Sequence, residues 1–139
     1  MPSFGPVVPI LRIFDEAKAR EFYVGFLGCK IVFEHRFGDN FPLYMGVSLA
    51  GCELHLSEHY GDGGPGAHVR IGADDIDGFT KSLREKDYKF VKPGDAERQP
   101  WGALEVTIAD PFGNRLTFTQ EAGDADSQAP MPGVTFPEA

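Results

Sequence analysis

A chain of 139 residues, 42% of them hydrophobic, has the size of one domain with a sizeable core. Its 21 acidic residues outnumber 13 basic ones, which gives a formal net charge of −8. This balance repels a phosphate backbone or an anionic membrane surface and attracts cations. We therefore expect no nucleic-acid or membrane partner and retain a cationic small molecule as a ligand, with plain solubility as the alternative reason for the acidic surface.

The cysteine content and the lack of long apolar runs indicate a compartment. Cys29 and Cys52 are too few for a disulfide framework. No basic segment followed by an apolar one precedes the first predicted strand, and no apolar run is long enough to span a bilayer. We expect a cytoplasmic protein whose two thiols are reduced and buried as small apolar side chains.

The first half of the chain predicts a strand, a helix and three more strands. Pro9 lies near the start of the first strand, where a missing N–H costs least. Asp15 is the predicted helix cap and Gly28 the predicted end, and apolar residues recur between them at helical spacing. The predicted elements are a strand over 7–13, a helix over 16–27 and strands over 30–37, 43–49 and 53–58.

The second half predicts the same order after a boundary at residues 60–66 (YGDGGPG), which are dense in turn formers. Asp74 or Asp75 is the predicted cap of the second helix. Residues 110–113 (DPFG) predict the last turn, with Gly113 where a positive φ is easiest. The elements are a strand over 68–71, a helix to about residue 86 and strands over 88–91, 104–109 and 114–120.

The two halves align with each other, which indicates a duplication. Residues 51–57 (GCELHLS) match residues 113–119 (GNRLTFT) at a shift of 62 residues, and the first strands match at a shift of 60, which places Val8 on His68. We predict one α+β domain over 1–120 made of two tandem βαβββ modules, about 7–58 and 67–120. A Pro/Gly/Ala-rich C-terminal tail follows over 121–139.

Strand periodicity predicts which side chains face the helices. Leu54 and Leu56 alternate with His55, and Leu116 and Phe118 alternate in the same way with Thr117. The apolar set packs under the helices, so the opposite face is left for other contacts. Because one face of each sheet needs filling, a ligand groove on that face is the simplest expectation. The side chains of the opening strands that also face the groove are Val8, Ile10, Arg12, His68 and Arg70.

Several short motifs between residues 7 and 120 have a recognisable pattern. They are residues 8–11 (VPIL), 21–23 (EFY), 26–28 (FLG), 99–102 (QPWG), Glu105, 110–111 (DP) and 113–114 (GN). Together they resemble the vicinal-oxygen-chelate superfamily, which groups glyoxalase I, extradiol dioxygenases, fosfomycin resistance enzymes and bleomycin resistance proteins. The Gln-Pro-Trp-Gly stretch resembles the bleomycin-binding branch. The resemblance implies a curved mixed sheet around an aromatic-lined groove.

The same resemblance implies a homodimer. In the bleomycin-binding branch, a proline in the first strand accompanies exchange of N-terminal strands between two protomers, and two drug grooves form at the interface. Pro9 lies at the matching position. From the residues alone, the favoured explanation is that Pro9 shortens an edge strand.

Metal enzymes of this superfamily hold a divalent ion at four groove-facing positions, which here carry Val8, His55, His68 and Thr117. A catalytic zinc site needs about three protein ligands, and Val8 and Thr117 stand where His and Glu are expected. We therefore expect no cofactor. The alternative is a divalent metal on His55 and His68 with a third ligand from a nearby set: Glu53, Glu58, His59 and Glu105.

By resemblance, the expected function is to bind and sequester a flat, cationic drug of the bleomycin type, without catalysis. Such a ligand needs aromatic faces and carboxylates. Trp101 and Phe33 are the expected stacking pair, and Glu105 or the acidic loops near Asp39 or Asp62 supply negative charge. The predicted ligand-binding residues are Trp101, Phe33, Phe37, His35, Glu105, His55, His68 and Gly102.

Two other functions and one structural alternative fit the same residues. A metal-dependent lyase, transferase or dioxygenase would use His55 and His68 with an acidic third ligand. A binder of an unrelated planar metabolite would explain the positive charge that Arg12, Arg70 and His68 add to the groove face. Trp101, the only tryptophan, is explained equally as a core anchor.

Overall fold

The computed structural model describes residues 2–121, so the tail predicted over 121–139 lies outside the described residues except for its first position. The chain divides into two compact units. Unit one contains the described residues up to Val69 together with Ala109–Arg115. Unit two contains Arg70–Ile108 together with the described residues from Leu116 onward.

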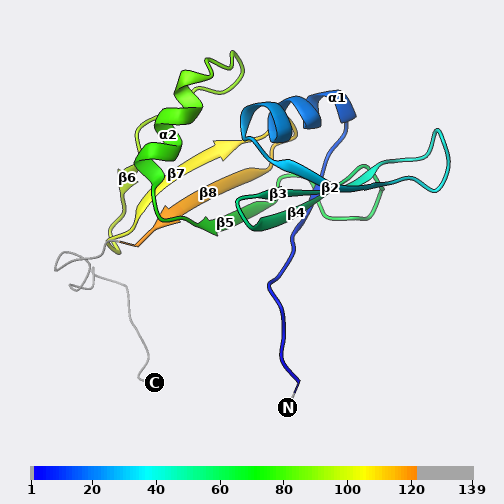
Figure 1. Ribbon diagram of the computed structural model, residues 1–139, viewed down its shortest axis with the longest axis horizontal. Helices are drawn as coiled ribbons and strands as arrows, with labels where there is room; N and C mark the ends of the chain where they lie inside the picture. The colour runs from blue at the N-terminus through cyan, green and yellow to red at the C-terminus, as the bar shows by residue number, and fades with distance from the viewer. Residues whose placement is uncertain (1, 122–139) are drawn as a thin grey trace. The chain divides into compact units, whose positions relative to one another are not determined.

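Two four-stranded sheets repeat one strand order (Figure 1). In sheet A the order is β1-β4-β3-β2, with β1 parallel to β4 and the other pairs antiparallel. In sheet B the order is β5-β8-β7-β6. The strands of sheet A are β1 Ile10–Arg12, β2 Lys30–His35, β3 Tyr44–Leu49 and β4 Cys52–Ser57. Those of sheet B are β5 His68–Gly72, β6 Glu97–Arg98, β7 Leu104–Ala109 and β8 Arg115–Gln120. The α+β class and the repeated βαβββ order are confirmed.

The helices begin where the sequence predicts. The Asp15 carboxylate accepts a hydrogen bond from the Lys18 N–H at 2.9 Å, and Asp75, not Asp74, caps the second helix through the Gly78 N–H at 3.0 Å. Gly28 ends the first helix with a φ of 87°. The helical elements are α1 Glu16–Ala19, η1 Arg20–Phe26 and α2 Ile76–Glu85.

The first helix changes from α to π form after one turn, which the sequence did not predict. The Leu27 N–H reaches back to the Phe22 carbonyl at 2.9 Å, a spacing of five residues. The wider turn keeps the predicted apolar side chains on one buried face. These side chains, each at most 3% exposed, are Ala19, Phe22, Tyr23, Phe26 and Leu27.

Each sheet has an apolar face, as the alternation predicts. In sheet A, Leu54 and Leu56 are buried beside their cross-strand partners Val47 and Met45. In unit two, α2 lies along sheet B (Figure 1), and the Phe79 ring of α2 lies 4.7 Å from the ring of Phe118. None of the described helices is long and apolar enough to cross a membrane.

Two predicted strands are wrong in position. The first strand begins at Ile10, not at residue 7, because Pro9 has no N–H to donate and only its carbonyl is used, by the His55 N–H at 3.0 Å. Residues 88–91 form a turn, closed by the Val91 N–H to the Tyr88 carbonyl, before Pro93. The strand of this module is instead the two-residue β6, at the base of the hairpin to β7.

Strand β2 lies at one end of sheet A, and all six of its residues are exposed. It pairs with β3 in an irregular register: Ile31 pairs with Val47 and Phe33 with the adjacent Gly46. Val32 is therefore an extra residue in the ladder, a β-bulge. Beyond β2, the chain continues into an extended loop before β3 (Figure 1).

The turn between β7 and β8 belongs to unit one and carries two buried polar side chains, Asp110 and Asn114. Asp110 Oδ1 accepts hydrogen bonds from the N–H groups of Phe112 and Asn114, both at 2.8 Å. Asp110 Oδ2 accepts from the Tyr23 hydroxyl at 2.6 Å and from the Asn114 amide at 2.8 Å. The Asn114 amide also donates to the Arg12 carbonyl at 2.9 Å. We call Tyr23, Asp110 and Asn114 the aspartate anchor. The aspartate anchor therefore ties the β7–β8 turn to η1 and to β1 within unit one.

The equivalent turn of sheet A, between β3 and β4, has only two residues. Leu49 pairs with Cys52, and Ala50 and Gly51 between them have φ values of 49° and 93°. Two consecutive positive φ values are typical of a type I′ hairpin turn. Ala50 adopts this conformation at a steric cost that glycine does not have.

Candidate functional site

The polar face of sheet A carries a group of aromatic rings. Register places Phe33 of β2 beside Gly46 of β3, and Gly46 beside His55 of β4. A side chain at position 46 would clash with the Phe33 ring, so the glycine lets this ring lie on the backbone of the sheet. Phe33 is still 37% exposed. The sheet therefore presents a flat, supported aromatic surface.

Three rings form this surface, which we call the aromatic face: Phe33, Tyr44 and His55. The Phe33 and Tyr44 rings are stacked, with centroids 6.0 Å apart and an interplanar angle of 15°. The His55 ring meets both edge-on, at 5.1 Å from Phe33 and 5.3 Å from Tyr44. Such contacts hold the rings in a fixed arrangement that suits a planar ligand.

Both ring nitrogens of His55 take part in hydrogen bonds. Nδ1 lies 2.8 Å from the Tyr44 hydroxyl, and Nε2 lies 2.6 Å from the Glu53 carboxylate. Burial raises the pKa of Tyr44, and the negative charge of Asp62 adds to this, so the phenol stays protonated. The Glu53 carboxylate has no proton to give, so it accepts the hydrogen bond from Nε2.

A second aromatic group follows β2 into the loop. The His35 and Phe37 rings meet edge-on at 4.6 Å, and Phe37 meets His59 in the same way at 6.0 Å. Arg12 donates to the His59 carbonyl. Phe37 is exposed. Phe33, His35, Phe37 and His55 of the predicted ligand set therefore all lie in unit one.

The Gln-Pro-Trp-Gly stretch is the turn of the β6–β7 hairpin in unit two. The Gly102 N–H donates to the Gln99 carbonyl at 2.8 Å, and the Gln99 N–H donates to the Ala103 carbonyl at 2.7 Å. Gly102 has a φ of 96°, a conformation that favours glycine. Trp101 at the tip is 44% exposed, so it is not a core anchor.

Glu105 holds the Trp101 side chain. Its Oε2 accepts from the indole Nε1–H at 3.3 Å, from the Thr119 hydroxyl at 3.0 Å and from Arg70. Burial opposes ionisation of Glu105, but the hydrogen bonds from Arg70, Thr119 and Trp101 outweigh it and lower the pKa. Glu105 is only 8% exposed. Its charge is therefore already compensated by Arg70.

The metal-ligand positions of the resemblance do not fit a metal ion. Val8 has no donor atom, and the Thr117 hydroxyl is hydrogen-bonded to that of Thr107 at 2.7 Å. His55 uses both ring nitrogens in hydrogen bonds, and His68 lies exposed at the start of β5. Within residues 2–121, no three His, Cys, Asp or Glu side chains are grouped as a metal site.

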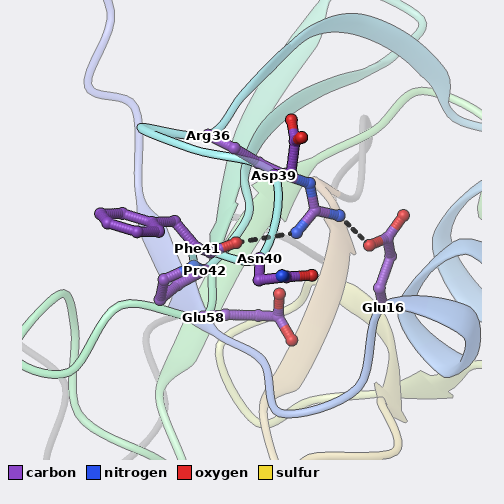
Figure 2. A pocket seen from close by; sticks show the side chains of 7 residues that line it. All are labelled: Glu16, Arg36, Asp39, Asn40, Phe41, Pro42 and Glu58. Atoms are coloured by element: carbon purple, nitrogen blue, oxygen red, sulfur yellow. Dashed lines mark hydrogen bonds and ion pairs between the residues drawn. The ribbon is translucent and has the colours of Figure 1, made fainter.

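The loop after β2 borders an open pocket of about 650 Å³ in unit one (Figure 2). Asp39, Asn40 and Glu58 line it together with the ion pair of Arg36 and Glu16. Asp39 was one of the acidic residues that the sequence offered for cation binding. The pocket is lined by three carboxylates and one guanidinium, and Phe41 and Pro42 complete the lining.

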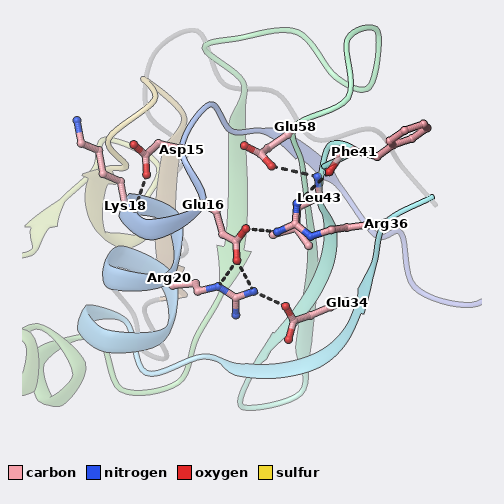
Figure 3. Close-up of polar contacts among 9 residues, drawn as sticks. All are labelled: Asp15, Glu16, Lys18, Arg20, Glu34, Arg36, Phe41, Leu43 and Glu58. Atoms are coloured by element: carbon pink, nitrogen blue, oxygen red, sulfur yellow. Dashed lines mark hydrogen bonds and ion pairs between the residues drawn. The ribbon is translucent and has the colours of Figure 1, made fainter. Parts of the chain in front are cut away.

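Ion pairs fix the wall of this pocket (Figure 3). Arg20 of η1 bonds Glu16 at 2.8 Å and also contacts Glu34 of β2, and Arg36 bonds the Phe41 carbonyl at 2.9 Å as well as Glu16. The hydrogen bond from Arg20, together with that from Arg36, lowers the pKa of Glu16 despite its partial burial. The network ties the loop after β2 to the first helix.

The structure groups the predicted residues in a way that the sequence only partly anticipated. Phe33 with His55, and Trp101 with Glu105 and Gly102, are brought together within their own units. Pairing of Phe33 with Trp101 involves both units and stays a prediction. Tyr44 and Gly46 were missed, although they share the strand periodicity of β3 that would have found them. The contact from Arg70 to Glu105 had no signal in the sequence.

A family model described as a glyoxalase superfamily protein matches residues 2–125 of the chain. Among curated proteins, none matches significantly.

Three solved structures with similar folds are 20% to 25% identical to this chain in sequence. A member of the glyoxalase/bleomycin resistance protein/dioxygenase superfamily from Sphaerobacter thermophilus is 25% identical, with a TM-score of 0.61, over 82% of this chain and 94% of that chain. A bleomycin-binding protein in complex with bleomycin is 22% identical, with a TM-score of 0.67, over 85% and 99%. An antibiotic-binding protein from Streptomyces sp. CB03234 is 20% identical, with a TM-score of 0.68, over 88% and 100%. They share the fold of this chain.

Proposed function

Because the chain belongs to the glyoxalase superfamily, we propose that it binds and sequesters a flat, cationic small molecule of the bleomycin class without transforming it. The observation that carries the proposal is the pair of supported, half-exposed aromatic surfaces. Phe33 lies on Gly46 in sheet A, and Trp101 is held by Glu105 on the β6–β7 turn. Both present ring faces for stacking.

The proposal includes a homodimer in which grooves form at the interface, in the cytoplasm. Pro9 and the extended residues before it support this part. Phe4 and Val7 are each at least 90% exposed, and covering them with a partner would bury further apolar area. A light-scattering mass of twice the 15.2 kDa chain is the expected result. A monomer mass at high protein concentration would contradict the homodimer.

The binding test is a titration with metal-free bleomycin followed through Trp101, the only fluorescent tryptophan of the chain. We expect a saturable change with a Kd of about 1 µM or tighter and one drug per chain. Calorimetry on the same samples reports a site that leaves the fluorescence unchanged. Absence of both signals at saturating drug would refute the proposal.

Two matched aromatic variants locate the ligand. Phe33→Ala removes a ring of the aromatic face and is expected to weaken binding by about tenfold or more. Phe90→Ala removes an exposed ring in unit two, outside both surfaces, and should leave the affinity unchanged. Equal affinities of the two variants would place the ligand away from the aromatic face.

A second candidate is a binder of planar metabolites without positive charge. Arg70 favours it, since this side chain is half-exposed and brings its guanidinium to the carboxylate that holds Trp101. Under this candidate, neutral or anionic planar compounds bind more tightly than their cationic counterparts. A preference for the cation would exclude it.

A further inference from the structure

Glu97 lies directly opposite Glu105 in the β6–β7 hairpin. The two residues are cross-strand partners in the antiparallel register. Opposite residues project from the same face of a sheet, with Cβ atoms about 4.5–5.5 Å apart. The Trp101 indole N–H donates to the Glu105 carboxylate at 3.3 Å. The Glu97 side chain therefore projects from the face of the hairpin on which Glu105 contacts this ring.

The two carboxylates of this pair have different environments. Glu105 is buried and accepts from Arg70, Thr119 and Trp101. Glu97 is exposed, and within residues 2–121 its carboxylate makes no hydrogen bond or ion pair. Arg70 compensates one of the two negative charges, so one carboxylate on this face of the hairpin remains uncompensated. That carboxylate belongs to Glu97.

We propose that Glu97 recognises the cationic group of a planar ligand stacked on Trp101, while Glu105 is a positioning residue that fixes the indole. This inference rests on the proposed function and names the residue that selects for positive charge. A guanidinium or ammonium group on a ring over Trp101 would lie within reach of the exposed Glu97 carboxylate. Arg70 does not oppose this, because its charge is already paired with Glu105.

The test compares two planar probes of equal ring size. One is 9-aminoacridine, which is cationic at pH 7.5, and the other is acridine, which is neutral at this pH. Calorimetric titrations of the full chain give a Kd for each, and their ratio is the cation preference. We expect the wild type to prefer the cation, and the preference to shrink when salt is raised, since exposed charges are screened.

Glu97→Gln keeps the size of the side chain and removes its charge. We expect it to weaken 9-aminoacridine binding by about twofold to fivefold, the range for an exposed charge contact. Acridine binding and the near-ultraviolet circular dichroism of Trp101 should stay the same. Glu85→Gln, at an exposed position of α2, is the matched control and should change neither probe.

Glu105→Gln tests the positioning role. We expect the near-ultraviolet dichroism of Trp101 to fall, acrylamide quenching to rise, and both probes to bind more weakly. A merely structural role for Glu105 would lower stability and leave the spectrum of the folded protein unchanged.

The outcomes separate this inference from the proposed function. If 9-aminoacridine depends on Glu97 but bleomycin does not bind, the cation site stands and the drug class is wrong. If bleomycin binds and Glu97→Gln leaves the cation preference intact, the inference is overturned and the proposed function stands. Absence of binding by either probe at millimolar concentration overturns the inference as well.

Discussion

The turn that joins the last two strands is stabilised differently in the two modules. The β3–β4 turn has two residues, Ala50 and Gly51, and depends on backbone conformation alone. The β7–β8 turn is held by the aspartate anchor, whose members are at most 6% exposed. The two modules therefore share one strand order, but only one of these turns is held by buried polar side chains. We therefore expect equivalent positions in the two modules to contribute unequally to the free energy of unfolding.

The largest expected effect is at the aspartate anchor. Asp110→Ala removes the acceptor of four hydrogen bonds, which come from the Tyr23 hydroxyl, the Phe112 and Asn114 N–H groups and the Asn114 amide. We expect the free energy of unfolding to fall by about 3–5 kcal/mol, measured by urea denaturation. Asp39→Ala, in the exposed loop, is the control and should cost under about 0.5 kcal/mol. A loss below about 1 kcal/mol at Asp110 would contradict the anchor role.

Alkaline pH should weaken the anchor and leave the β3–β4 turn unaffected. Burial, together with the charge of Asp110, raises the pKa of Tyr23 well above its ordinary value. The unfolded chain therefore loses this proton first. The stability that Tyr23 contributes is complete below about pH 10 and is lost as the pH rises toward the pKa of the folded state.

The expected loss from this residue approaches about 1.4 kcal/mol per pH unit. Urea unfolding of the wild type and Tyr23→Phe between pH 8 and 11 measures it. Identical slopes in the two proteins would show that Tyr23 ionises equally in the folded and unfolded states.

At neutral pH, Tyr23→Phe removes one hydrogen bond and keeps the ring. We expect a cost of about 1–2 kcal/mol, smaller than that of Asp110→Ala, because Asp110 Oδ2 still accepts from Asn114. Thermal unfolding monitored by far-ultraviolet circular dichroism is a suitable measurement. A cost equal to that of Asp110→Ala would mean that the phenol, not the carboxylate, organises the anchor.

The smallest effect is expected at the β3–β4 turn, and it is a gain. Position 50 has a φ of 49°, which is strained for alanine. Ala50→Asn or Ala50→Gly lowers this strain and should stabilise the protein by about 0.5–1 kcal/mol. Gly51→Ala introduces a side chain at a φ of 93° and should destabilise it by about 1–2 kcal/mol. If Ala50→Asn were destabilising, the turn would depend on contacts of the alanine methyl group and not on its backbone.

The sequence predicted the parts of the fold that depend on local chemistry. Asp15 and Gly28 mark the ends of the first helical segment, and the alternation in β4 identified the buried leucines. The sequence-based prediction was wrong where backbone hydrogen bonding determines the element. Pro9 shortens the first strand, and no helical spacing of side chains reveals the π turn of η1.

The sequence predicted on which face of the sheet the candidate site lies, but it did not predict which side chains contact one another there. Periodicity placed His55 on the face away from the helices, and the Gln-Pro-Trp-Gly motif singled out Trp101. The partners of these residues depend on cross-strand register. Tyr44 beside His55, and Glu97 opposite Glu105, follow from pairings that only the structure defines. The ion pair with Arg70 shows in addition that Glu105, the carboxylate singled out from the sequence, is the one whose charge is already compensated.

The bulge at Val32 has a consequence for how this protein behaves when it is crowded. An end strand with Ile31, Val32 and Phe33 exposed offers a template on which further chains could add as strands, the first step toward fibrils. A bulge interrupts the regular spacing of backbone donors and acceptors that such addition needs. Lys30 and Glu34 add charges along the same strand. The irregular register of β2 therefore protects the strand that carries Phe33 from polymerisation while leaving its ring exposed.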